Sequence, residues 1–203
     1  MDKIIKERLS VIVSFVVGGT AGFSLSSFIQ AQEIKQWLTG IAIAFSLIVS
    51  LIISAWYKSI SGNKKKFVRY AVICAVIFVV MMPAFFVLYN MFETRLPVTV
   101  QSRGRNYITT DSVFIRGLYF SGEAKSEIDA LKKSNPVAGF QLADLFKDSN
   151  YDIDMVWTNT SRILAKLLII FSYMFFIASL IACITFTTEL IQDTSNPVLE
   201  QKK

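Results

Sequence analysis

The chain has 203 residues, of which 53% are hydrophobic, and it carries a formal net charge of +6. Its charged residues are clustered between long apolar runs, whereas a soluble domain interleaves the two so that each helix or strand keeps a face toward water. This segregation is typical of a membrane protein. The basic excess flanks the apolar runs, where lipid head groups explain it, so we expect no nucleic-acid partner.

The sequence offers little of what enzymes use. Histidine is absent, and both cysteines, Cys74 and Cys183, lie within apolar runs. The commonest general base and metal ligand is therefore missing, and a zinc site needs about four nitrogen or sulfur ligands. No phosphate-binding loop or nucleophile motif occurs. We predict a non-enzymatic protein with no catalytic residue, no metal and no cofactor.

Four apolar runs are long enough to cross a bilayer, whose ~30 Å hydrocarbon core requires about 20 helical residues. The predicted spans are 9–29, 37–57, 68–89 and 163–190. The first run is too long for a cleavable signal peptide, so we expect it to be retained. The fourth is longer than needed, and its polar end, which includes Glu189, suits emergence from the lipid. Aromatic residues mark the predicted membrane edges: Trp37, Trp56, Tyr57, Tyr70, Tyr89 and Trp157.

Lysine and arginine residues predict how the spans are oriented. The N-terminal segment 1–8 contains three basic residues, the loop 58–67 contains four, and the connection 30–36 contains one. Basic segments favour the cytosol. We therefore expect the N-terminus, the loop 58–67 and the C-terminal tail 191–203 to be cytosolic, in a plasma membrane of the bacterial inner-membrane type.

The segment 90–162 differs from the rest because acidic and basic residues are mixed along it. Its pattern predicts a small α+β domain outside the cytosol, with strands at 98–101, 107–110 and 112–120 and helices at 122–133 and 137–146. Ser121 is placed to cap the first of these helices. The predicted fold is thus an all-α membrane bundle of four transmembrane helices, with a small α+β extracytoplasmic domain inserted between the third and fourth.

Small residues recur at helical spacing in the first two spans and are predicted to form helix-packing surfaces. They let helix backbones approach closely, and van der Waals contact then drives association. We favour packing within one bundle over a homo-oligomer, because the second span follows the first directly. The candidates are Ser10, Ser14, Gly18, Gly22, Ser26, Gly40 and Ala44.

Two residues within the spans carry functional alternatives. Pro83 in the third span removes one backbone hydrogen bond, so it is either a hinge or a tolerated kink, and we favour the kink. Lys166 lies one turn inside the fourth span, where it is either a functional charge or a side chain that reaches the head groups, and we favour the second.

The extracytoplasmic domain is where we expect recognition, because binding residues concentrate on exposed segments held by a scaffold. In layout the chain resembles small multi-span inner-membrane proteins that confer immunity to pore-forming toxins or exclude a second phage or plasmid, and accessory subunits of membrane complexes. We predict a membrane or extracytoplasmic protein partner; the alternative is a small oligomeric channel. The candidate recognition residues are Arg103, Arg105, Arg116, Phe140 and Phe146.

Overall fold

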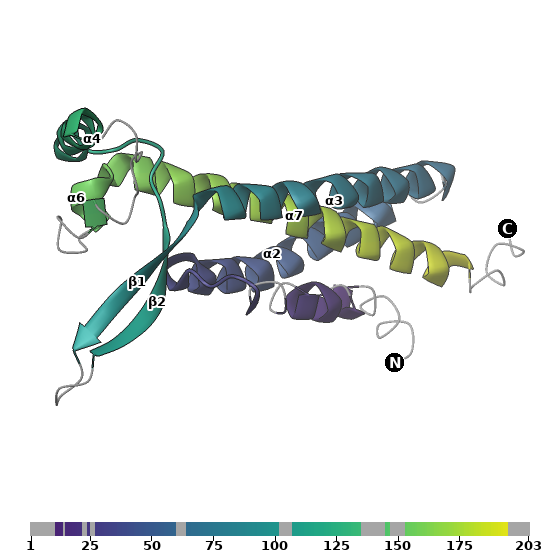
Figure 1. Cartoon of the computed structure of the whole chain (residues 1–203). Coiled ribbons are helices and arrows are strands. Elements are labelled where there is room, and N and C mark those ends of the chain that lie inside the picture. Colours follow the sequence, from purple (N-terminus) through teal and green to yellow (C-terminus); the bar gives the residue numbers. More distant parts are fainter. Residues whose placement is uncertain are drawn as a thin grey trace, which may run out of the picture. The chain divides into compact units, whose positions relative to one another are not determined.

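A computed structural model describes residues 11–13, 15–21, 24, 27–59, 64–101, 107–134, 145–146 and 153–194. These residues are mostly helical (Figure 1). The elements in chain order are α2 (Gln32–Ser59), α3 (Lys64–Phe92), β1 (Glu93–Gln101), β2 (Tyr107–Ile115), α4 (Gly122–Ser134), α6 (Ile153–Val156) and α7 (Asn159–Thr194). They form two compact units. Unit 1 comprises Met1–Ile29, Ile34–Val87 and Ile170–Lys203, and unit 2 comprises Gln30–Glu33 and Leu88–Ile169.

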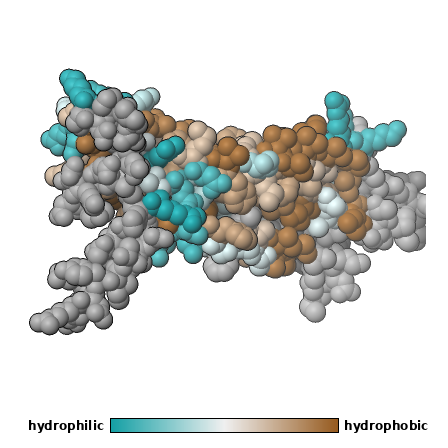
Figure 2. Space-filling model, viewed as in Figure 1, coloured by the Kyte–Doolittle hydropathy of each residue, from teal (hydrophilic) through white to brown (hydrophobic). Residues whose placement is uncertain are grey.

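Three helices are long and apolar enough to cross a membrane: Gln32–Tyr57, Lys65–Phe92 and Asn159–Ile191. Even the shortest, at 26 residues, extends about 39 Å, which exceeds a ~30 Å hydrocarbon core. The surface over these helices is largely hydrophobic (Figure 2). These helices indicate a membrane-embedded protein.

The first predicted span, 9–29, is not confirmed. The apolar helix found there covers Val11–Ala21, and a helix of that length extends about 16 Å, roughly half of the hydrocarbon core. Four of the eight residues from 22 to 29 lie outside the described residues, as do Ser10 and Ser14. The count that the structure supports is therefore three.

In unit 1, α2 buries one residue in every four along a single face. That face consists of Leu38, Ala42, Ser46, Ser50 and Ser54, all buried. The serines add little polarity, because Ser46 Oγ donates to the Ile43 carbonyl at 2.8 Å and Ser50 Oγ to the Ser46 carbonyl at 2.7 Å. A hydroxyl satisfied by its own helix lets neighbouring backbones approach without an unpaired polar group.

Gly18 is the small residue that makes the closest helix contact. A Cβ atom there would lie 2.8 Å from Ile181 Cγ1 of α7 and 3.2 Å from Ser46 Cβ of α2. Gly40 differs, because a Cβ atom there would meet no described atom within 4 Å, and both Gly40 and Ala44 are exposed. Of the predicted packing residues, Gly18 therefore lies where three helical segments meet, whereas Gly40 and Ala44 lie on the opposite face of α2.

This difference predicts opposite outcomes for two equal substitutions. Gly18→Val should lower the free energy of unfolding by about 1–3 kcal/mol, because overpacking forces side chains out of their preferred rotamers. Gly40→Val should leave it nearly unchanged. The measurement is the unfolding midpoint of each purified variant in detergent. Equal effects at the two positions would show that Gly18 makes no special contact; a loss of oligomers in Gly40→Val alone would instead place a partner helix on the exposed face.

A cluster of aromatic rings closes one end of unit 1, where α2, α3 and α7 meet. Tyr57 of α2 and Phe67 of α3 have ring centroids 4.4 Å apart, and Phe186 of α7 lies 6.1 Å from Phe67. Beside this cluster the carboxylate of Glu189 accepts a hydrogen bond of 2.7 Å from Ser54 Oγ. Glu189 is only 6% exposed. Glu189 of α7 is therefore packed against α2, and the expectation that this end of the helix emerges from the lipid stays a prediction.

Unit 2 has a hydrophobic core of its own, formed by Ala124, Ile128, Leu145, Phe146, Val156 and Trp157. Helix α4 supplies the first two, and it begins where the sequence predicted. Ser121 caps it, because the N–H of Ala124 donates to Ser121 Oγ at 3.1 Å, which satisfies one of the free donors of the first turn. The predicted helix 137–146 lies outside the described residues except for Leu145 and Phe146, which are helical.

The sheet of unit 2 is a two-stranded antiparallel ladder that pairs Glu93 with Ile115 at one end and Gln101 with Tyr107 at the other. The predicted strand 98–101 lies within β1, and the predicted strand 107–110 lies within β2. Each observed strand is longer than the predicted one. The third predicted strand, 112–120, is wrong. Its first residues continue β2, and the chain then bends at Leu118 and Tyr119 before Phe120 makes an isolated bridge with Trp157.

Candidate functional site

Four charged side chains converge in unit 2 where α7 begins. Arg162 places Nη2 3.2 Å from Glu33 Oε2, its Nη1 pairs with Asp154, and Lys166 pairs with the same oxygen of Glu33. The Arg162 side chain is 11% exposed. The two basic residues are four apart and so share one face of α7. They bind the segment Gln30–Glu33 to the first turns of α7.

The same short segment is held from α3. The hydroxyl oxygen of Tyr89 accepts hydrogen bonds from the backbone N–H groups of Gln30, at 3.0 Å, and Ala31, at 3.2 Å. Tyr89 is buried. These N–H groups precede α2 and would otherwise need water or another acceptor. Gln30–Glu33 is thus held from both sides by elements of unit 2.

The charged cluster is suited to holding two segments of the chain together. Two acids and two bases balance, and a guanidinium fork suits two carboxylates at once. Glu33 Oε1 and Arg162 Nε are buried without a hydrogen-bond partner among the described residues. Within that part of the chain no group of three or more His, Cys, Asp or Glu side chains is placed to hold a metal ion.

A tight seam joins the bend after β2 to the start of α7. The N–H of Ser121 donates to the Val156 carbonyl at 2.9 Å, and the N–H of Thr158 donates to the Tyr119 carbonyl at 3.3 Å. Ser161 Oγ donates to the same Tyr119 oxygen at 3.1 Å. A Cβ atom on Gly117 would lie 2.9 Å from Trp157 Cβ and would also collide with Ser161 Oγ. The seam therefore requires glycine at 117.

In the ladder of β1 and β2, one backbone hydrogen bond shows which residue pairs are hydrogen-bonded and which are not. The N–H of Arg116 donates to the Phe92 carbonyl at 2.9 Å, which extends the register by one hydrogen-bonded pair. Because such pairs alternate with non-hydrogen-bonded pairs, Pro97 and its partner Asp111 form a non-bonded pair. The nitrogen of Pro97 therefore faces outward, where its missing N–H costs the ladder nothing.

Because of this alternation, the outer edges of β1 and β2 differ in the backbone N–H groups that they present. The outer edge of β1 lacks a donor at its centre, and proline on an edge blocks further strand pairing. The outer edge of β2 has an N–H at every alternate residue from Tyr107 to Ile115. Among the described residues no third strand pairs with it. Within the described residues β2 therefore has a strand neighbour on one side only.

The structure describes two of the five predicted recognition residues, of which one is exposed and one is buried. Arg116 is exposed directly after β2, whereas Phe146 is buried with its ring centroid 5.3 Å from that of Trp157. Arg103, Arg105 and Phe140 lie outside the described residues. The remaining candidates, Gly22 and Ser26 of the first predicted span, also lie outside them.

Pro83 lies within α3, which continues as a helix on both sides of it. Its role as a hinge stays a prediction. Lys166, expected to reach the head groups alone, has Glu33 as its ion-pair partner. Sequence reasoning missed Glu33 and Arg162; the available signal was an acid in the short connection before the second span and two bases four residues apart at the start of the fourth.

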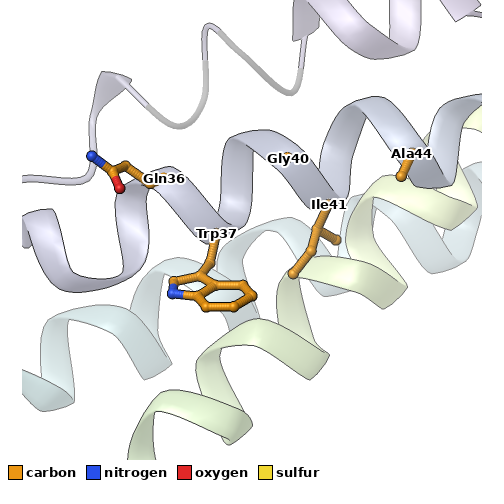
Figure 3. Close-up of a pocket in the computed structure, with 5 residues that line it drawn as sticks. All are labelled: Gln36, Trp37, Gly40, Ile41 and Ala44. Carbon is orange, nitrogen blue, oxygen red and sulfur yellow. The ribbon is translucent and has the colours of Figure 1, made fainter.

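A shallow depression lies on the exposed face of α2 (Figure 3). Its lining residues are Gln36, Trp37, Gly40, Ile41 and Ala44. All five come from one helix, and Gly40 leaves the gap between the larger side chains. The depression is a dent in a helix surface and presents no converging polar groups.

Comparison with protein-family models, with curated proteins and with solved structures finds no match for this chain. Its function is therefore inferred from its own residues and their geometry.

Proposed function

We propose that the chain is a non-enzymatic multi-pass membrane protein that displays unit 2 on the extracytoplasmic side as a protein-interaction domain. A protein that confers immunity or exclusion, or an accessory subunit of a membrane complex, would have this design. The proposal includes four spans and cytosolic termini, which the basic segments 1–8 and 58–67 support.

The observation that carries the proposal is the outer edge of β2, with which no described strand pairs. Unit 2 has its own core and is anchored through Arg162 and Tyr89 to the segment that opens α2. A two-stranded ribbon is marginally stable alone, so strand addition would benefit it. An extended segment of a partner would gain backbone hydrogen bonds along β2.

The channel alternative has less support. It relies on serine-lined faces, yet Ser46 and Ser50 are buried and donate to carbonyls of their own helix. Hydroxyls so occupied favour close helix packing. Current recordings in planar bilayers test the alternative directly, and reproducible single-channel steps from the purified protein would overturn the display proposal.

Two proline substitutions in one residue pair test the edge of β2. Thr99 and Thr109 are partners at a non-hydrogen-bonded position, so proline at either keeps the ladder bonds. Thr109→Pro removes a donor from the β2 edge and should abolish partner binding, whereas Thr99→Pro alters the β1 edge that Pro97 already blocks and should not. Adducts are measured in native membranes with a photo-crosslinking residue at position 111.

A discrete adduct in wild type and Thr99→Pro, lost in Thr109→Pro, is the expected result. Adducts that persist in Thr109→Pro would contradict recognition through this edge. A partner that still co-purifies from native membranes with a chain lacking residues 95–157 would contradict the display proposal as a whole, because that deletion removes the domain.

A further inference from the structure

Leu118 and Tyr119 are large apolar side chains left exposed in unit 2, at 39% and 64%. They form the bend that follows Gly117, between β2 and α4. Single exposed apolar residues are ordinary on a protein surface, so their exposure alone indicates nothing. Their position along α7 is what distinguishes them.

The seam fixes that position. The Tyr119 carbonyl accepts hydrogen bonds from the Thr158 N–H and from Ser161 Oγ, and Gly117 lies against Trp157 and Ser161. Leu118 and Tyr119 are therefore level with the first turn of α7. The membrane-crossing length of that helix begins at Asn159.

The apolar outer face of α7 begins almost immediately below this level. Ile163, Leu164 and Leu167 are each more than 40% exposed. Ile163 is two residues beyond Ser161, which is about 3 Å along a helix axis. If the apolar face of α7 starts at the edge of the hydrocarbon core, the Leu118–Tyr119 segment is level with the boundary between head groups and acyl chains.

This is the height at which membrane proteins concentrate exposed aromatic residues, because such rings are apolar with a polar end. Trp157 was predicted to mark the interface, but it is buried in the core of unit 2. Tyr119 is the exposed aromatic residue of the seam. Arg116, also exposed, is a cation two residues before Leu118 that suits a lipid phosphate.

We propose that Leu118 and Tyr119 form a lipid-contacting loop that inserts into the head-group boundary of the leaflet next to unit 2, with Arg116 on lipid phosphates. The occupant of this surface is the phospholipid bilayer, because the loop is continuous with the lipid-facing side of α7. The loop holds the bend after β2 on the membrane surface. This assignment does not depend on the β2 edge or on a protein partner.

The test places an environment-sensitive fluorophore on cysteines introduced by Leu118→Cys, Tyr119→Cys and, as the matched control, Lys132→Cys on exposed α4. The native cysteines are replaced by Cys74→Ala and Cys183→Ala. The full chain is reconstituted into vesicles of phosphatidylethanolamine and phosphatidylglycerol. Labels at 118 and 119 should emit at shorter wavelength than the label at 132. A lipid carrying a spin label near its glycerol should quench them more strongly, and aqueous iodide less.

Iodide quenching at 118 and 119 equal to that at 132 would overturn the proposal, since the loop would then be in water. Shielding from both quenchers would overturn it too, because a protein surface would then cover the loop. Both substituted side chains are exposed, so the core of unit 2 is left intact. Helical circular dichroism equal to that of wild type confirms this for each variant.

Discussion

Gly117→Ala is expected to lower the free energy of unfolding of unit 2 by about 2–4 kcal/mol. Overpacking costs about 1–3 kcal/mol, and the loss of a hydrogen bond of the seam costs about 1 kcal/mol. The added methyl group would lie 2.9 Å from Trp157 Cβ and 3.1 Å from Trp157 Cγ. The indole cannot retreat, because it is buried between Phe120 and Phe146. The expected readout is a lower midpoint of thermal unfolding in detergent.

Gly122→Ala is the matched control. A Cβ atom at Gly122 would meet no described atom within 4 Å, and alanine is a better helix former than glycine at the start of α4. That variant should match wild type or exceed it slightly. If Gly117→Ala is as stable as Gly122→Ala, the seam is looser than the structure indicates.

Ser161→Ala distinguishes a collision from a change in backbone flexibility. Ser161 Oγ is the other atom that a Cβ at position 117 would meet. Removing it in Gly117→Ala should relieve part of the clash, so the double variant should lose less than the sum of the single variants. Additive losses would point to flexibility, because independent effects add.

The elements predicted correctly are those encoded by neighbouring residues. The capped helix after Ser121 and the strand pair on either side of residues 102–106 have local signals, and the structure places both. The long apolar runs likewise gave three of the helices. Each of these elements is longer than predicted, because polar residues at the ends continue the helix or strand beyond the apolar pattern.

The failures involve residues far apart in the chain. The run 112–120 is rich in β-branched and aromatic residues, but β2 ends at Ile115, two residues before Gly117 passes against Trp157, forty positions later. Glu189 accepts a hydrogen bond from Ser54, 135 positions away, and no sequence signal indicated that contact. The pairing of Glu33 with Arg162 spans 129 positions. No periodicity within one segment encodes such contacts.

Arg162→Met should lower the free energy of unfolding by about 1–3 kcal/mol, because loss of one partner from a part-buried ion pair, 11% and 25% exposed, leaves the other charge poorly compensated. Arg162 is the centre of the cluster, since it contacts both Glu33 and Asp154. Its removal frees one side of the segment that opens α2. The measurement is again the unfolding midpoint in detergent, repeated at raised salt, to which a buried pair should respond little.

Arg95→Met is the matched control for charge removal. Arg95 pairs with Glu93 at 2.7 Å, and its side chain is 60% exposed whereas that of Glu93 is 9% exposed. Water screens an exposed guanidinium, so this variant should lose less stability than Arg162→Met. Equal losses of unfolding free energy at the two arginines would show that the burial of Arg162 adds nothing to the stability that its ion pairs provide.

Arg162→Lys separates geometry from charge. Lysine keeps the positive charge but lacks the planar fork that reaches two carboxylates at once, so its stability should fall between wild type and Arg162→Met. In Glu33→Gln, Arg162 and Lys166 lose their shared anion, and in Glu33→Gln/Arg162→Met the uncompensated charge is smaller again. The double variant should therefore be more stable than the sum of the single losses predicts. That coupling would identify the cluster as the clamp between the opening of α2 and the start of α7, whatever unit 2 binds.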